Sequence, residues 1–140
     1  MNHAVLIVFL LFFSMLSAQD AIEGTWKTID DISGKPRSIV NIYKKNGKWY
    51  GRIKRVLDEN ERGQLCVECK GNDYNKPIEG LEIIKNLKKD EDEYTNGTIM
   101  DPENGKVYKC KIWIDDTDSN ILNVRGYIAF FYRTQCWVRE

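Results

Sequence analysis

The chain has 140 residues, and 21 Lys and Arg are balanced by 21 Asp and Glu, so the formal net charge at pH 7 is zero. This balance does not point to nucleic acid or an anionic membrane surface as a partner. The single histidine, His3, lies in the predicted leader described below, so none is expected in the mature protein. Catalytic pairs of the Ser-His-Asp or Cys-His type and histidine metal sites are therefore excluded.

An apolar N-terminal segment predicts a signal peptide over residues 1–18. Residues 4–16 carry no charge, and the small residues Ser17 and Ala18 follow them. An apolar core before a small-residue cleavage site is typical of secretory leaders. The alternative is an uncleaved anchor, but the apolar run is shorter than the ~20 residues that a spanning helix needs. Cleavage after Ala18 predicts a single domain over residues 19–140, periplasmic or secreted, with no stable membrane span.

The rest of the chain alternates short segments rich in Ile, Val, Tyr and Trp with turn signals. The clearest turn is Asn46-Gly47, the strongest two-residue hairpin signal. Residues 58–75 are polar and predict a long loop, whereas residues 80–88 fit either a helix or a strand, with a strand or a single irregular turn favoured. Strands are predicted over residues 22–29, 37–45, 48–57, 93–100, 106–115, 121–129 and 130–139.

About eight short strands without a convincing long helix indicate an all-β sandwich or barrel. Gly24 and Trp26 form a Gly-x-Trp on the first predicted strand, and the last strand is basic and aromatic, with Trp137 and Arg139 near its end. A small up-and-down antiparallel barrel closes when its first and last strands pair, and an indole against an arginine can seal its floor. The sequence therefore predicts such a barrel, whose interior holds side chains or one small ligand.

Three long segments carry a family resemblance, namely residues 28–40, 97–110 and 125–137. They resemble a secreted bacterial family known as domain of unknown function 2147, and the similarity covers nearly all of the chain after the leader. The resemblance implies a lipocalin-like β-barrel in the periplasm or outside the cell, without a particular activity. In the wider lipocalin group an arginine near the last strand stacks on the tryptophan of the Gly-x-Trp. Arg133 and Arg139 are both candidates, and spacing does not choose between them.

Four cysteines permit three disulfide pairings. Cys66-Val67-Glu68-Cys69 is open to interpretation as a redox pair or as half of a zinc site. A disulfide that pins the loop in an oxidising compartment is favoured, because the motif lies in a predicted loop without a helix to activate a thiol. We predict the pairs Cys66–Cys69 and Cys110–Cys136, and no metal site.

Polar-tipped aromatic residues and arginines on the strands predict a ligand site. Facing inward, a few of them would orient a ligand in a mainly apolar pocket. The leading hypothesis is a barrel that binds a small apolar or amphipathic molecule without a cofactor. The alternative is a fully packed barrel that docks an envelope protein through an outer face. The residues predicted to contact the ligand are Tyr108, Tyr43, Trp49, Arg125 and Arg133.

Four carboxylates, Asp30, Asp31, Asp101 and Glu103, are candidates for acid–base catalysis. All lie in turn signals near Pro or Gly, where a carboxylate supports turn geometry. A glycosidase-type pair would need two of them to converge on one cleft at about 5 to 10 Å. We therefore expect no enzymatic activity, with a carboxylate-based hydrolase as the alternative.

Overall fold

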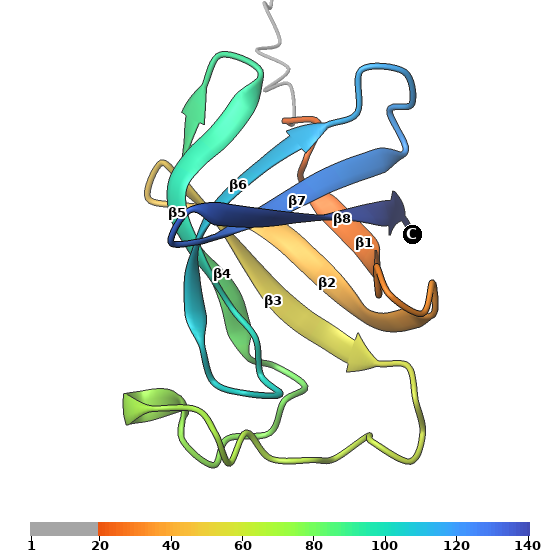
Figure 1. Ribbon diagram of the computed structural model, residues 1–140, viewed down its shortest axis with the longest axis vertical. Coiled ribbons are helices and arrows are strands. Elements are labelled where there is room, and N and C mark those ends of the chain that lie inside the picture. Colours follow the sequence, from red (N-terminus) through yellow and green to blue (C-terminus); the bar gives the residue numbers. More distant parts are fainter. Residues whose placement is uncertain (1–19) are drawn as a thin grey trace, which may run out of the picture.

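Sequential strands pair around the molecule into a closed, eight-stranded antiparallel barrel (Figure 1). The computed structural model describes residues 20–140, and the predicted signal peptide over residues 1–18 lies outside this range. Within it, the predicted all-β, up-and-down architecture is confirmed. The strands are β1 (Gly24–Ile29), β2 (Pro36–Lys45), β3 (Lys48–Val56), β4 (Glu82–Asp90), β5 (Glu93–Met100), β6 (Val107–Ile114), β7 (Ile121–Ile128) and β8 (Phe131–Arg139).

The barrel closes where β1 meets β8, and an indole–guanidinium stack covers this seam. Trp26 lies opposite Arg139 in the strand register, and the guanidinium carbon of Arg139 is 4.3 Å from the centre of the Trp26 ring. Arg139 also donates hydrogen bonds to the carbonyl oxygens of Ala21 and Ser119, at 3.0 and 3.1 Å. Arg139, and not Arg133, is therefore the arginine that packs on Trp26.

Large side chains fill one end of the barrel. Trp26, Leu122 and Trp137 are almost completely buried there, and the Trp26 indole donates to the Ile22 carbonyl oxygen at 2.9 Å. This end also holds the chain segment that leads into β1 and the turns that join β2 to β3, β4 to β5 and β6 to β7 (Figure 1). Because the packed core occupies this end, any space for a ligand must lie at the other.

Residues 80–88, ambiguous in the sequence, form most of β4. Ile84 pairs with Gly51 on β3 and with Ile99 on β5. The backbone of Asn86 has a positive φ of 61°, at the point where pairing with β5 is interrupted. This irregularity explains why the apolar residues of the segment do not alternate as in an ordinary strand.

The long connection between β3 and β4 is a loop, as predicted, and extends to residue 81. It contains one short 3₁₀ helix, η1 (Gly71–Asp73), and an isolated bridge between Leu65 and Pro77. The predicted disulfide between Cys66 and Cys69 is formed within it. No helix among residues 20–140 combines the length and the apolar character needed to cross a membrane.

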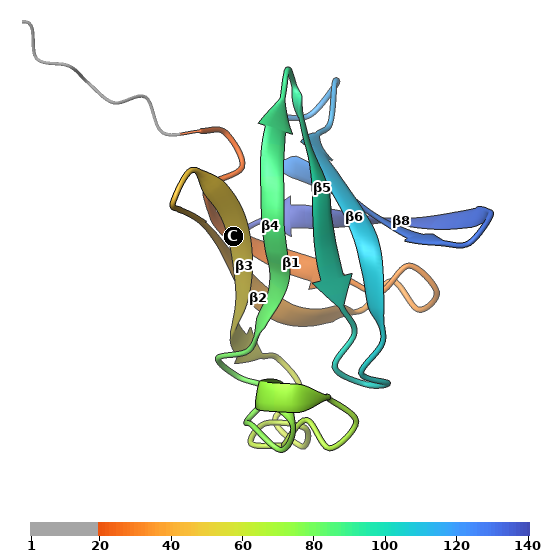
Figure 2. The same ribbon diagram turned by 90° about the vertical axis from the view of Figure 1, so that its left-hand side faces the viewer.

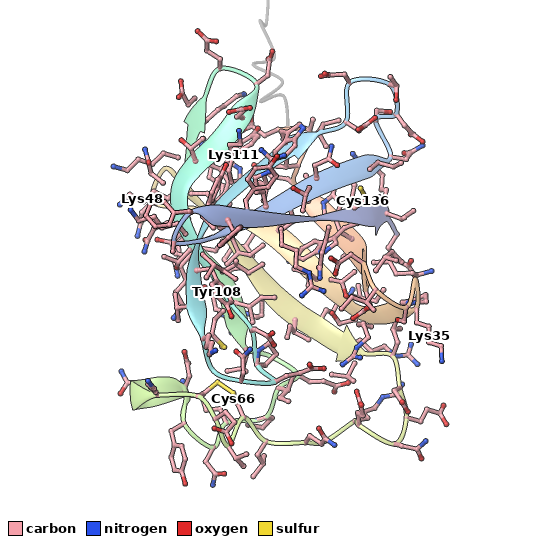
Figure 3. The ribbon with its side chains drawn as sticks, in the orientation of Figure 1. Lys35, Lys48, Cys66, Tyr108, Lys111 and Cys136 are labelled. Atoms are coloured by element: carbon pink, nitrogen blue, oxygen red, sulfur yellow. A yellow bond between two sulfur atoms is a disulfide. The ribbon has the colours of Figure 1, made fainter. Side chains whose placement is uncertain are left out.

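The predicted disulfide between Cys110 and Cys136 is wrong, because both are free thiols. Cys110 on β6 points into the barrel and is 2 % exposed, whereas Cys136 on β8 is exposed on the outer surface. They pair with different residues of the intervening strand β7, Gly126 and Asn123 respectively. Figure 3 shows Cys136 on the last strand, far from the disulfide loop labelled at Cys66. Opposite faces of a sheet cannot be bridged without moving the backbone.

We expect Arg139→Ala to lower the free energy of unfolding by about 1 to 2 kcal/mol, because it removes the stack on Trp26 and two hydrogen bonds to backbone carbonyls. Urea denaturation measures the change. Arg55→Ala is the control, since Arg55 makes no ion pair among the described residues, and should change stability by less than about 0.5 kcal/mol. An equal loss in both variants would contradict the assigned role of Arg139.

We expect one fast-reacting thiol in the folded protein and a second only after denaturation without reductant. Cys136 is the accessible thiol. Burial raises the pKa of the Cys110 thiol to about 12, so it offers little of the reactive thiolate in the folded state. Thiol titration with and without denaturant measures both counts. Finding no free thiol after denaturation would contradict this assignment and support the predicted Cys110–Cys136 disulfide.

A candidate ligand cavity at the open end of the barrel

The end of the barrel opposite the packed core holds an open cavity of about 690 Å³. The connections β1–β2, β3–β4 and β5–β6 and the end of β7 surround its mouth. Its volume falls within the range of ordinary small-molecule sites. Its deep wall is mostly apolar and includes Ile53, Ile83, Ile99, Val124 and Trp137.

Polar groups in the deep wall bond mainly to one another. The hydroxyls of Thr28 and Ser38 are 2.9 Å apart, and the Trp137 indole donates to the Gln135 side-chain oxygen at 3.1 Å. Tyr108, half-buried on β6, also lines the wall, and Figure 3 shows it between the body of the barrel and the disulfide loop. The interior is therefore an apolar surface with a few fixed polar positions.

Two turns at the mouth are built in the same way. In the first, the Asp30 carboxylate accepts backbone hydrogen bonds from Ile32 and Ser33. In the second, the Asp101 carboxylate accepts one from the backbone N–H of Glu103. In each turn a glycine four residues after the aspartate donates to its carbonyl oxygen, at 2.8 and 2.7 Å. Both turns share the pattern Asp-x-x-x-Gly-Lys, so the sequence did contain a signal for this pair.

An ion pair fixes the β1–β2 turn to β8. The guanidinium of Arg133 donates hydrogen bonds to both carboxylate oxygens of Asp31, and the Gln135 amide donates to the same carboxylate at 3.3 Å. The hydrogen bonds from Arg133 hold the pKa of the Asp31 carboxyl below its usual value. Asp31 is therefore ionised near neutral pH and keeps Arg133 paired at the rim.

A second group of ion pairs connects opposite sides of the mouth. Arg37, at the start of β2, pairs with Glu103 in the β5–β6 turn and lies 3.8 Å from Glu61 in the β3–β4 loop. In an eight-stranded barrel, β2 and the β5–β6 turn lie on opposite sides. Since all three side chains are at least 42% exposed, these pairs add little stability. These ion pairs instead fix the position of the β5–β6 turn and the β3–β4 loop relative to β2, and so set the distance across the opening.

The disulfide loop borders the mouth and rests on the β5–β6 turn (Figure 2). A Cβ atom at Gly105 would lie 1.9 Å from the carbonyl oxygen of Glu68, and Gly105 has a positive φ of 70°. Only glycine fits this contact, because both the space and the backbone conformation exclude a side chain. The Cys66–Cys69 ring, through Glu68, is thereby held at one side of the cavity.

Two of the five predicted ligand residues, Tyr108 and Arg133, line the cavity. Their contact with a ligand stays a prediction. The expected inward placement of Tyr43 and Arg125 is wrong, because both lie on the outside of the barrel. Tyr43 stacks on Tyr50 and donates to Glu82, whereas Arg125 stacks on the outward-facing rings of Trp113 and Tyr132.

Trp49 is inside the barrel but at its packed end, away from the cavity. Its ring meets Tyr94 edge-on, with centroids 4.9 Å apart, and it is 3 % exposed. Among the described residues its indole N–H has no hydrogen-bond partner. Trp49 is therefore part of the core and not of the cavity wall.

The four carboxylates considered for catalysis do gather at the mouth, but as turn-forming and ion-paired groups. The backbone hydrogen bonds from Ser33 and Ile32 lower the pKa of Asp30, and Arg133 lowers that of Asp31. Neither carboxyl is thus held protonated, as a general acid must be near neutral pH. Among residues 20–140, no three His, Cys, Asp or Glu residues are arranged to hold a metal ion.

An eight-stranded barrel with one sealed end and one open, largely apolar end defines a lipocalin-like protein. The sequence matches the family described as "uncharacterized protein conserved in bacteria", domain of unknown function 2147, over residues 24–139, and the chain belongs to this family. The fold is similar to a solved structure of protein HP1028 from Helicobacter pylori, described as belonging to the lipocalin family, with a TM-score of 0.72 and 19% identity. That similarity covers 84% of this chain and 82% of the other. No curated protein matches the sequence.

We expect Asp31→Asn to lower the free energy of unfolding by about 0.5 to 1 kcal/mol at neutral pH, because the pair is partly exposed. The pKa of Asp31 is lower in the folded than in the unfolded protein. Its stabilisation is therefore complete above the unfolded pKa and is lost as the pH falls through the folded pKa. Denaturation of wild type and variant at a series of pH values measures the difference, which should vanish in acid.

The control for this series is Asp92→Asn, an exposed aspartate in the β4–β5 turn with no ion pair among the described residues. It should leave stability almost unchanged at every pH. A stability difference for Asp31→Asn that persisted in acid would show that the loss does not come from the charge pair.

Proposed function

We propose that this barrel reversibly binds a small amphipathic molecule through its open end, in the periplasm or outside the cell. The observation that carries the proposal is the open cavity of about 690 Å³ with an apolar deep wall and a charged rim. Burial of an apolar chain against the wall would supply affinity. Tyr108 and the polar rim would orient the head group.

The charge at the rim favours a neutral or cationic head group. Five carboxylates and two guanidinium groups line the cavity, which gives a net charge of −3 for its lining at neutral pH. Both arginines are engaged by carboxylates, Arg37 by Glu103 and Arg133 by Asp31. An anionic head group would therefore meet a repulsive field at the mouth, whereas an ammonium group would be attracted.

A carrier explains the structure better than an enzyme. The lipocalin-like fold of the solved neighbour is typically non-enzymatic. The carboxylates at the mouth have structural partners, since Asp30 and Asp101 accept backbone hydrogen bonds of their turns and Asp31 pairs with Arg133. None of these three is free to act as an acid or base without loss of a contact that shapes the mouth.

The most direct test of the proposed binding site is a substitution whose new side chain occupies the cavity. Gly126 on β7 lines the cavity, and a Cβ atom there would meet its nearest neighbours, in Tyr108 and Ile99, at 3.7 and 3.8 Å, which is ordinary contact. Gly126→Leu therefore directs an isobutyl group into the space without backbone strain. We expect binding of a long-chain alkylamine to fall ~tenfold or more, measured by isothermal titration calorimetry, because the ligand and the new side chain compete for one volume.

The control is Lys54→Leu, which adds the same side chain on the exposed outer face of β3. It should bind the alkylamine as wild type does, and thermal unfolding should show both variants folded. The fatty acid of the same chain length tests the head group and should bind more weakly than the amine. Tighter binding of the fatty acid would overturn the assigned head-group class, and equal affinity of Gly126→Leu and wild type would overturn the cavity as the site.

A further inference from the structure

The tip of the β7–β8 hairpin is the most exposed apolar feature of the described residues. Phe130 is 99% exposed, Phe131 76% and Ile128 50%. In Figure 2 this hairpin, drawn in blue, projects from the side of the barrel beyond its neighbours. Phe130 and Phe131 are not in the buried core, so packing within the barrel does not account for them. Two adjacent phenylalanines held in water on a protruding turn indicate a surface that docks something.

The residues of the hairpin change in a fixed order away from the tip. Ile128 and Phe131 form the last pair of the strand register, and Tyr127 and Tyr132 form the next, with ring centroids 6.2 Å apart. No charged residue lies between Tyr127 and Tyr132. The hairpin therefore ends in an apolar tip that two phenolic side chains border on its outer face.

Basic residues follow directly behind the tyrosines on the outer face. Lys109 on β6 lies beside Tyr127, and Lys111 lies beside Arg125 in the next step of the register. The Arg125 guanidinium is 4.0 Å from the ring centre of Tyr132. Along the outer face of the hairpin, the apolar tip is thus followed by the tyrosine pair and then by Lys109 and Arg125, whereas Lys111 pairs with Glu93 at 3.2 Å.

We propose that the tip of the β7–β8 hairpin inserts into the surface of a lipid bilayer. A bilayer has this same order, from acyl chains through the interfacial layer preferred by Tyr to the head-group phosphates that attract Lys and Arg. The zero net charge of the whole chain does not reveal this local arrangement, in which Lys109 and Arg125 lie behind one apolar tip. The proposal does not depend on whether the cavity holds a ligand.

A convex tip favours a bilayer over a protein partner or a second copy of the chain. A protein interface that covered the tip would surround its apolar centre with a polar rim capable of hydrogen bonding on all sides. Here the two strands are paired with each other up to Ile128 and Phe131, and the tight turn beyond them presents the fully exposed ring of Phe130. Ile128 also lines the cavity, so the tip lies beside the mouth of the barrel.

The test is flotation with vesicles of phosphatidylethanolamine and phosphatidylglycerol. The protein is exported by its expression host and used as processed, with its intact mass recorded to establish the N-terminus. We expect the wild type to float with the vesicles and Phe130→Ser/Phe131→Ser to bind at least about tenfold more weakly. The matched control is Tyr74→Ser/Val138→Thr, which removes exposed apolar side chains elsewhere on the surface and should float as the wild type does.

A local measurement separates the hairpin from the N-terminal segment. In a Phe130→Trp variant, tryptophan fluorescence should gain a component that shifts to the blue with vesicles and is quenched by brominated acyl chains. Thermal unfolding of all variants excludes a folding defect. Equal flotation of the double serine variant and wild type, without quenching at residue 130, would overturn the proposal. So would dimers that form without lipid and disappear in the double serine variant, because the tip would then bind a second copy.

Discussion

The contact between Trp26 and Arg139 is the constraint on which the rest of the structure depends. It lies on the two strands that close the barrel, opposite each other in the register. The same arginine donates to the carbonyl oxygens of Ala21 and Ser119, so one side chain joins the last strand to the segment before β1 and to the β6–β7 turn. The pairs Trp26–Arg139 and Lys27–Val138 join the first and last strands and close the barrel, and closure of this kind protects strand edges that an open sheet would expose.

Closure at one end determines where a cavity can exist. The buried tryptophans and the apolar side chains around them fill the barrel beside the Trp26–Arg139 stack. Farther along the same strands several inward positions are small, such as Gly126 and Ser38, and the space between opposite walls is not filled. The division into a solid floor and an open mouth therefore follows from side-chain volume along strands that are otherwise alike.

Features that depend on local pattern were predictable, and features that depend on register were not. The alternating segments, the Asn46-Gly47 turn and the Gly-x-Trp gave the strands and the closed barrel. Tyr43 and Arg125 were misplaced because the chemical suitability of a side chain does not reveal which face of the sheet it occupies, and a shift of one residue reverses that face. Cys110 and Cys136 were paired wrongly for the same reason, since they lie on opposite faces with β7 between them.

The acidic character of the mouth follows from the tight turns that connect the strands there. Asp30 and Asp101 are present because each carboxylate completes a tight turn by accepting backbone N–H groups, which is a structural requirement. With Glu103 and Glu61 beside them, these turn residues outnumber the two arginines of the rim. The preference of the cavity for neutral or cationic head groups thus arises from the geometry of these turns. A substitution that neutralised Asp30 or Asp101 would change both the turn conformation and the negative electrostatic potential at the mouth. Head-group selectivity in this barrel is for that reason tied to the conformation of its loops.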